Sequence, residues 1–228
     1  MASSAAAEYA VEGPRTRAPG GSGPPSPYTP RSMDKRSGLG CLFEVVETLV
    51  LTLVIFFVIQ TFVAQPYQVQ QQSMESTLEP GQYVLVDKLT PRWDTYGRGD
   101  VVVFNPPPTW TEDSTPFIKR VIGLPGDTVE VKGDGLVYIN DVSLDEPYTF
   151  ANDGINEPTT ASLDQRRWVV TEGELFVMGD HRQKSADSRV FGPIKTTDVI
   201  GRAFLRYWPI STIAILQTPS YPELPAAP

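Results

Sequence analysis

The chain has 228 residues, which is enough for one domain of moderate size with terminal extensions. Its formal net charge of −8 lies entirely beyond residue 47, where 14 basic residues stand against 22 acidic ones, and such an acidic domain argues against a nucleic-acid partner. A single cysteine excludes an internal disulfide framework, and a single histidine argues against a Cys/His zinc site.

Residues 1–40 form a segment rich in Pro, Gly, Ser and Ala that carries little apolar content. Such a segment buries too little surface to offset the entropy lost when a chain is ordered. It is therefore expected to be a disordered tail.

An apolar run follows over residues 41–64, and its stretch from 48 to 64 holds no charge. At about 1.5 Å per residue in a helix, a run of this length spans a hydrocarbon core of roughly 30 Å. The alternative is a cleaved signal peptide. The segment before the run is longer than an ordinary n-region, however, and Phe62 is too large for an A-x-A-like cleavage site ending at Ala64. The run therefore predicts an uncleaved transmembrane helix.

Basic residues near the run predict its orientation. Arg31, Lys35 and Arg36 precede it closely, whereas the first basic residue after it is Lys88. Because basic flanks stay on the cytoplasmic side, we expect a cytoplasmic N-terminus and an extracytoplasmic C-terminal part. The chain is then a single-pass protein of the plasma (inner) membrane.

From residue 65 to about 217 the sequence changes to short β-like runs separated by turn residues. Turns at residues 133–135 and at Asn140-Asp141 predict hairpins. The fold class is expected to be mainly β, with an antiparallel β domain and a small inserted lobe or loop over about 133–170. The Pro-rich residues 218–228 are expected to be loose. The predicted strands cover residues 83–86, 100–104, 117–124, 128–132, 136–139, 142–144, 168–171, 175–178 and 199–208.

Three segments concentrate residues that carry chemistry: QQSMESTL at 71–78, KRVIGLPGD at 119–127 and GDHRQKSADSR at 179–189. Together with GDVVVF at 99–104, and in this order behind one anchor, they resemble the bacterial type I signal peptidases from the anchor to about residue 208. The resemblance implies an all-β catalytic domain with an inserted β lobe of variable size. It also implies cleavage of secretory signal peptides at the outer membrane face.

The resemblance implies roles for individual residues. Ser73 matches the nucleophile, Lys119 the general base, and Ser185 a serine whose hydroxyl helps to orient that lysine. Four further residues match positions that hold the site together through ion pairs and hydrogen bonds: Asp180, Arg182, Asp187 and Arg189.

A Ser–Lys pair is also chemically reasonable in its own right. A serine hydroxyl needs a base to take its proton. A lysine can be that base only when it is neutral, which at an ordinary pKa of about 10.4 holds for about one molecule in 2,500 at pH 7. Burial among apolar groups lowers the pKa of a lysine. Lys119 shares a strand face with Phe117 and Val121, so its pKa is expected to be strongly depressed.

Two positions need separate interpretation. A Ser-His-Asp triad would have to use His181, the single histidine, but the family often has a different residue there, and we interpret it as a turn residue. Where many members have a small hydroxyl residue that helps to bind the oxyanion, this chain has Gln71. The backbone N–H of Ser73 remains one donor, and the amide N–H of Gln71 is the candidate for the second.

The expected mechanism is cleavage of a preprotein through an acyl-enzyme, without a metal or cofactor. The partners are the signal peptides of preproteins and the lipid bilayer, while the sequence indicates neither the particular preproteins nor the oligomeric state. By resemblance, shallow apolar pockets for substrate side chains are lined by Tyr67, Val69, Met74, Leu78, Val103 and Ile118, with ordinary core packing as the alternative. Residues that could either touch lipid or be buried are Trp93, Trp110, Trp208 and Ile210.

Two other functions share parts of this pattern. A self-cleaving repressor also uses a Ser–Lys pair, but the membrane anchor and the lack of a DNA-binding domain argue against it. A non-enzymatic anchored β-domain that binds exported proteins would not need a desolvated lysine beside a serine.

Overall fold

The computed structural model of the chain describes residues 38–89, 93–161 and 165–224. The tail expected over residues 1–40 lies almost wholly outside this described part. The chain divides into two compact units, Met1–Val45 and Val46–Pro228, and each is described by itself.

An apolar helix begins the described part of the chain. Helix α1 (Gly38–Val58) continues into a π-helical turn (Ile59–Val63). Within the described residues, the one helical stretch long and apolar enough to cross a membrane is Gly40–Val63. Its large apolar side chains are exposed, and such an uncovered apolar helix is suited to a lipid environment.

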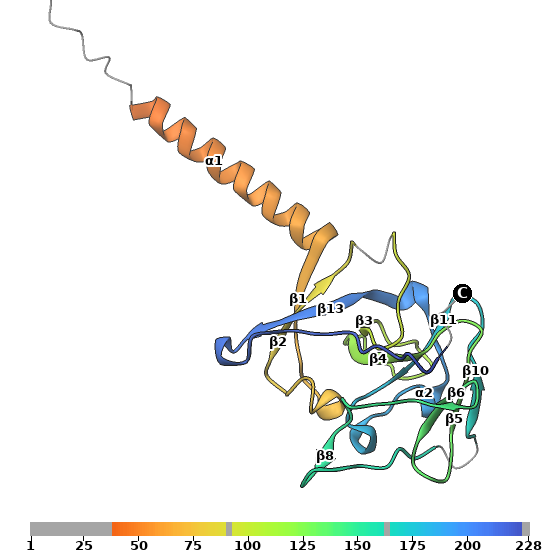
Figure 1. The fold of residues 1–228 in the computed structure, drawn as a ribbon. Helices are drawn as coiled ribbons and strands as arrows, with labels where there is room; N and C mark the ends of the chain where they lie inside the picture. Colours follow the sequence, from red (N-terminus) through yellow and green to blue (C-terminus); the bar gives the residue numbers. More distant parts are fainter. Residues whose placement is uncertain (1–37, 90–92, 162–164, 225–228) are drawn as a thin grey trace, which may run out of the picture. The chain divides into compact units, whose positions relative to one another are not determined.

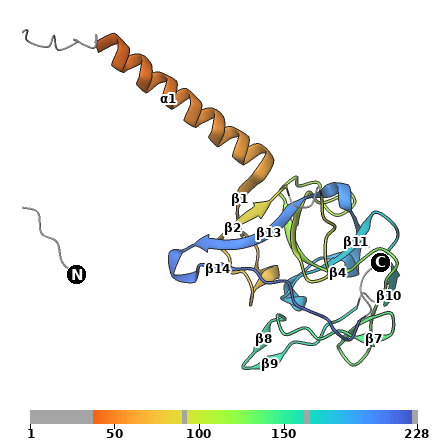
Figure 2. The ribbon, with the colours of Figure 1, turned by 45° about the horizontal axis from the view of Figure 1, so that its top comes forward.

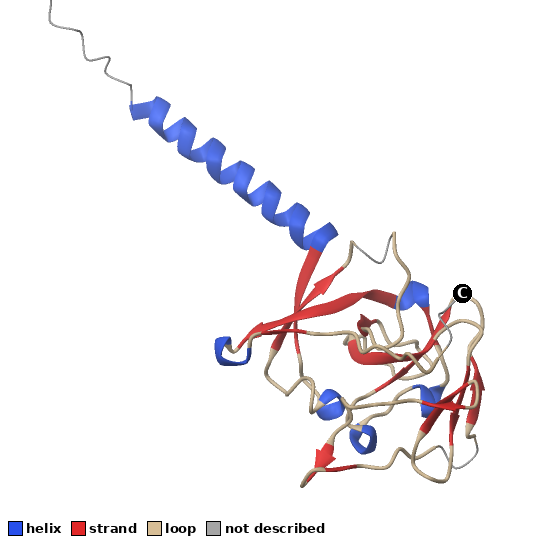
Figure 3. Ribbon diagram, in the orientation of Figure 1, coloured by secondary structure: helices blue, strands red, loops and turns tan. Residues whose placement is uncertain are grey.

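The main structure within Val46–Pro228 is an eight-stranded antiparallel sheet (Figures 1 and 3). Its strands lie in the order β1–β2–β13–β3–β4–β11–β12, and β14 pairs with β13. The expected mainly antiparallel β fold is therefore confirmed. The strands are β1 (Ala64–Gln68), β2 (Tyr83–Asp87), β3 (Val101–Phe104), β4 (Phe117–Gly123), β11 (Glu174–Met178), β12 (Ile194–Lys195), β13 (Val199–Trp208) and β14 (Ala214–Ile215).

Strand β13 lies in the middle of this sheet, although it comes late in the chain. It pairs with β2 on one side and with β3 on the other (Figure 1). A side chain at Gly201 would collide with the backbone carbonyl of Asp87, so glycine permits the close approach of β13 to β2.

Strand β1 has no counterpart among the predicted strands. It reads AQPYQ, a polar stretch that contains Pro66 and shows no β-like alternation of apolar residues. Proline is tolerated in an edge strand because the outer edge of such a strand forms no ladder hydrogen bonds. Strand β1 lies at such an edge, next to β2.

A smaller sheet has the order β10–β5–β6–β7. Its strands are β5 (Thr128–Val131), β6 (Val137–Ile139), β7 (Val142–Ser143) and β10 (Arg167–Val169). Both predicted hairpins form here. Asn140 and Asp141 have φ angles of 52° and 69°, which matches the two positive φ values of a type I′ turn.

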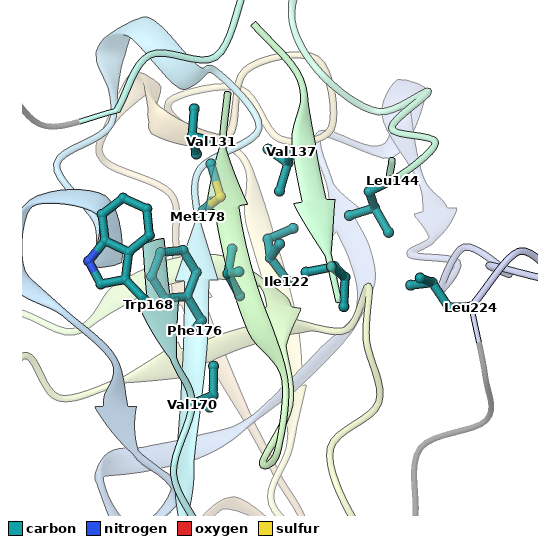
Figure 4. Packing of buried hydrophobic residues seen from close by; sticks show 11 residues of the cluster. Ile122, Val131, Val137, Leu144, Trp168, Val170, Phe176, Met178 and Leu224 are labelled. Carbon is teal, nitrogen blue, oxygen red and sulfur yellow. The ribbon is translucent and has the colours of Figure 1, made fainter. Parts of the chain in front are cut away.

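A core of eleven buried side chains joins the two sheets (Figure 4). Ile122 and Phe176 come from the large sheet, while Val131 and Val137 come from the small one. Trp168 packs on Phe176 with ring centroids 5.1 Å apart. Because this core fixes β4 and β11 from one side, it also fixes the strand that carries Lys119.

A short hairpin lies within the region of about 133–170 that is expected to be an inserted lobe or loop. It consists of β8 (Ala151–Asn152) and β9 (Ile155–Asn156), which pair only with each other among the described residues (Figure 2).

The C-terminal segment differs from the expected loose end over residues 218–224. Thr218 Oγ1 donates to Asp100 Oδ1 at 2.6 Å, and Leu224 is buried in the core of Figure 4. A high proline content alone does not reveal such anchors, because one hydroxyl and one apolar side chain suffice to fix the segment. Residues 225–228 lie outside the described part.

Candidate active site

Ser73 lies on a short 3-10 helix, Gln72–Met74, that follows β1. Met74 and Leu78 are fully buried, and the Leu78 N–H donates to the Met74 carbonyl at 2.7 Å. These apolar anchors hold the helix against the core and leave Ser73 only 2% exposed. The Ser73 carbonyl accepts a hydrogen bond from the His181 N–H at 3.1 Å, so both chain segments are fixed together.

Lys119 comes from β4, where it pairs with Val102 of β3. Its side chain is 1% exposed, and its Nζ lies 2.7 Å from Ser73 Oγ. The same nitrogen donates to the Ile118 carbonyl at 3.1 Å. The ring centroid of Phe117 lies 5.3 Å away, so apolar surface lies close to the amine.

This environment favours the neutral amine of Lys119. Burial lowers its pKa from 10.5 to about 8, and the nearby Arg189 cation contributes in the same direction. The carboxylates of Asp187 and Asp180 oppose the shift, because they stabilise the ammonium form. Burial dominates, as expected from the apolar neighbours of Lys119 in the sequence.

Asp180 forms a buried ion pair with Arg120, the residue after Lys119. Arg120 Nε and Nη2 donate to the two carboxylate oxygens at 2.8 and 2.7 Å, and both side chains are almost fully buried. The same carboxylate accepts from Thr77 Oγ1 at 2.6 Å, and Arg120 Nη1 donates to the Gly99 carbonyl at 2.8 Å. Asp180 therefore joins β4 to the segment that follows the serine.

Asp187 organises the rest of the segment 179–189. It accepts from Arg189 Nε and Nη2 at 2.8 Å each, from Ser185 Oγ at 2.7 Å and from the Gly179 N–H at 3.0 Å. Burial alone would raise the pKa of Asp187, but these hydrogen bonds and the Arg189 charge lower it below its usual value. Ser185 thus bonds to Asp187, and within the described residues no hydrogen bond joins it to Lys119.

Arg182 and Gly179 hold the segment 179–189 against Glu146 and the serine helix. Arg182 donates to both carboxylate oxygens of Glu146, at 2.9 and 2.6 Å, and to the Gly179 carbonyl at 2.9 Å. A side chain at Gly179 would collide with the Ser73 carbonyl and with Ser185, so only glycine allows the close packing of the segment on the serine helix.

His181 occupies a turn, as expected, but it is buried and 2% exposed. Its ring stacks on Phe150 with centroids 4.0 Å apart and planes 5° apart. Nδ1 lies 2.6 Å from Glu75 Oε2, and Nε2 lies 3.2 Å from Glu157 Oε2. The ring thus contacts two glutamates, and its contact to the serine is made by its backbone N–H.

A pocket lies between residues 66–71 and 115–118, the segments that lead to Ser73 and Lys119 along the chain. Four of the residues expected to line the substrate pockets do line it: Tyr67, Val69, Val103 and Ile118. The other two, Met74 and Leu78, are fully buried in the core and do not line it. Gln71 lies at the same pocket with an exposed side chain.

The candidates for lipid contact separate into two kinds. Trp93, Trp208 and Ile210 are exposed by 77%, 50% and 70%. Trp110, in contrast, is buried and packs edge-on against Phe104 at 5.6 Å.

Several residues of the site had no role assigned from the sequence. Arg120 could have been found, because a buried arginine beside Lys119 needs a carboxylate partner and Asp180 was already a candidate. Glu146 and Thr77 gave no signal, since each is an ordinary polar residue until the fold brings it to its partner. Among the described residues, no group of three or more His, Cys, Asp or Glu side chains is arranged to hold a metal ion.

The chain matches a protein family, curated relatives and a solved structure. The model of the family described as "Signal peptidase, peptidase S26" matches residues 42–208. A signal peptidase I of Leptolyngbya laminosa is 34% identical over 202 residues, covering 86% of this chain and 95% of the relative. A signal peptidase IB of Staphylococcus aureus strain Mu50 is 32% identical over 180 residues, covering 75% and 91%. A crystal structure of a signal peptidase I from Enterococcus faecalis V583 is 36% identical, covers 48% of this chain and 97% of its own, and superposes with a TM-score of 0.36.

Proposed function

Because the chain belongs to the signal peptidase family, peptidase S26, it is a serine endopeptidase that cleaves signal peptides, and we propose that Ser73 is its nucleophile and Lys119 its general base. The observation that supports this assignment is the 2.7 Å distance between Lys119 Nζ and Ser73 Oγ in a buried setting. Burial keeps part of the lysine neutral, and only the neutral amine can accept the serine proton.

The proposed reaction has two stages. Neutral Lys119 takes the proton of Ser73 while Oγ attacks the scissile carbonyl, and the resulting ammonium returns a proton to the leaving amine. An acyl-enzyme on Ser73 remains. A water molecule, deprotonated by Lys119, then attacks the ester and releases the second product.

The oxyanion of each tetrahedral intermediate needs donors that are already in place. The backbone N–H of Ser73 is the first proposed donor. The amide of Gln71 is the second, because its exposed side chain lies at the pocket beside the serine helix. Under this proposal Gln71→Ala lowers kcat by about 10- to 100-fold, and unchanged turnover of that variant removes Gln71 from the oxyanion site.

The substrate is proposed to bind as an extended strand. The pocket is lined by residues 66–71, which include the end of the edge strand β1, and by residues 115–118. An extended peptide placed between them can form main-chain hydrogen bonds with both segments. Small side chains before the scissile bond then face the apolar surface of Val69, Val103 and Ile118.

The enzyme is a membrane-anchored protein by family and by its apolar helix, and we propose the finer topology. Residues 41–64 form the anchor of a single-pass protein in the plasma membrane, and residues 65–217 form the extracytoplasmic peptidase domain. The cytoplasmic N-terminus follows from Arg31, Lys35 and Arg36 before the helix. Tethering enzyme and preprotein to one bilayer raises their effective concentration.

The test is cleavage of a preprotein by the full chain in detergent. Wild type is compared with Ser73→Ala and Lys119→Ala, and with two exposed control variants, Ser76→Ala and Lys195→Ala. We expect the first two to lose at least about 10³-fold in kcat, because the nucleophile and base act as a unit, while the controls keep full activity. Substantial activity of Lys119→Ala would place the base elsewhere.

A further inference from the structure

His181 contacts the serine segment at two points. Its backbone N–H donates to the Ser73 carbonyl at 3.1 Å, and its ring Nδ1 lies 2.6 Å from the carboxylate of Glu75. Glu75 directly follows the 3-10 helix that carries Ser73. His181 therefore contacts the residues on both sides of Met74, which are Ser73 itself and Glu75.

The opposite side of the imidazole ring, with Nε2, faces the hairpin β8–β9. Glu157, just after β9, places Oε2 3.2 Å from His181 Nε2, while Phe150, just before β8, stacks on the ring. The backbone around the hairpin is held as well, since the Phe150 N–H donates to the Asp180 carbonyl at 3.0 Å. A single side chain thus links the hairpin to the serine helix.

One atom in this group lacks a partner. Glu157 Oε2 is buried and accepts no hydrogen bond within the described part of the chain, although it lies at ion-pair distance from Nε2. A buried carboxylate oxygen without a donor is costly. Nε2 of His181, 3.2 Å away, can supply a donor, and it does so only when it carries a proton.

We propose that His181 is a positioning residue for Ser73, which holds the serine helix to the β8–β9 hairpin through Glu75 and Glu157 and does so fully only as the imidazolium. The proposal rests on the function assigned above to Ser73. It adds a pH-sensitive link to the site that is separate from the base.

The charge requirement follows from the imidazole itself. A neutral ring donates from one nitrogen and accepts at the other, whereas the cation donates from both. The neutral ring can therefore keep the bond to Glu75 while its other nitrogen presents a lone pair to Glu157. The charged groups that face the ring are these two carboxylates and Lys184, whose Nζ lies 3.4 Å from Glu75 Oε2.

The other charges of the neighbouring segment are already paired. Asp180 is bound by Arg120, and Arg182 is bound by Glu146. A cation at His181 therefore balances Glu75 and Glu157 together with Lys184, while a neutral ring leaves one negative charge in excess. Stacking on Phe150 favours the cation further.

The test uses the full chain in detergent and separates kcat from KM with a preprotein substrate. His181→Ala removes both ring contacts, and we expect kcat to fall by about 10- to 100-fold with KM nearly unchanged, because the serine loses its fixed position. His181→Asn places an amide N–H near the position of Nδ1, so it keeps the Glu75 bond and restores most of kcat. Glu157→Gln keeps the size of this side chain but removes the carboxylate charge that faces Nε2.

The matched control is Gln183→Ala. Gln183 Nε2 donates to the Pro158 carbonyl at 2.6 Å, so it also joins this segment to the chain beside β9, but it contacts neither Glu75 nor Ser73. We expect this variant to keep the wild-type kcat. An equal loss in Gln183→Ala and His181→Ala would show general anchoring of the hairpin and would overturn the proposal.

The dependence on pH distinguishes positioning from a purely structural role. The ratio of wild-type kcat to that of His181→Asn should be largest at acidic pH and approach one as pH rises and the wild-type ring becomes neutral. The protonation of Lys119 affects both proteins alike and cancels in this ratio. A ratio that is constant with pH, or wild-type kcat in His181→Ala, would overturn the proposal.

A spectroscopic measurement tests the link without using activity. His181 is the only histidine of the chain, so its ¹⁵N ring signals are unambiguous. In Glu157→Gln the ¹⁵N signal of Nε2 should differ from that of wild type, because this nitrogen then faces a neutral amide instead of a carboxylate. Identical ring signals in the two proteins would overturn the proposal even if His181→Ala does not fold. If Ser73→Ala remained active, the proposed function would fail while the ring signals would still report on the link.

Discussion

Replacement of Lys119 by Met is expected to abolish cleavage and to change stability in a direction that depends on pH. The side chain of Lys119 is 1% exposed, and methionine has a similar length without a charge. The variant therefore removes the amine while keeping most of the packing.

Burial lowers the pKa of Lys119 from 10.5 to about 8, so between these values the unfolded chain binds more protons than the folded one. Stability must therefore rise as pH increases through this window. The burial of Lys119 lowers the free energy of unfolding by about 3 kcal/mol at pH 7 and by about 1 kcal/mol at pH 10. Methionine removes this cost but also loses the contacts to Ser73 Oγ and the Ile118 carbonyl, which contribute about 1 kcal/mol each.

The net expectation is that Lys119→Met is about 1 kcal/mol more stable than wild type at pH 7 and about 1 kcal/mol less stable at pH 10. Urea unfolding of the full chain in detergent, followed by tryptophan fluorescence, measures both differences. Lys195→Met is the control, because Lys195 is exposed and its replacement should give the same difference at both pH values. A stability difference for Lys119→Met that does not change with pH would mean that burial does not perturb this lysine.

Three further predictions concern the same site. The kcat/KM of wild type should rise about tenfold per pH unit below pH 8 and level off above it, because only neutral Lys119 reacts; a plot of cleavage rate against pH that is flat from 6 to 9 would contradict this. Asp180→Asn should lower the free energy of unfolding by about 3–5 kcal/mol, because it leaves the Arg120 charge buried without its partner. In the same denaturation experiment, removal of the surface pair of Arg167 and Glu130 should lower the free energy of unfolding by less than about 1 kcal/mol. Gly179→Ala should lower kcat by about 100-fold while the protein stays folded, because the added methyl group pushes on the Ser73 carbonyl. The control is Gly133→Ala, where the atom nearest to the added methyl group is 3.9 Å away. Equal activity of both variants would contradict this prediction.

The sequence predicts most of the fold because the strands of the main sheet are short apolar runs between clear turn residues. The run at 199–208 becomes β13 with the same bounds, and Asn140-Asp141 forms the expected turn. Strand β1 could not be predicted, because its sequence AQPYQ has neither alternation nor β-branched residues. It is a strand because β2 offers it an edge, which is a tertiary cause.

The candidate site divides in a similar way. Ser73 and Lys119 could be singled out by resemblance, and the low pKa of Lys119 could be expected from its apolar neighbours. The carboxylate that balances Arg182 could not be found, because Glu146 is 36 positions away in a polar segment without a pattern. Likewise, nothing in the sequence places His181 between Glu75 and Glu157. The distant partners of these two residues depend on the packed fold, and the local sequence does not indicate them.

The place of β13 in the main sheet has a consequence for the timing of activity during synthesis. The serine side of the sheet, β1 and β2, and the lysine side, β3 and β4, are joined within the sheet by β13 alone. A ribosome makes Ser73 and Lys119 long before it reaches Trp208, so a nascent or truncated chain has both reactive residues but lacks the strand that brings their halves of the sheet together. We therefore expect cleavage activity to appear only after β13 has been made, although both reactive residues are present much earlier.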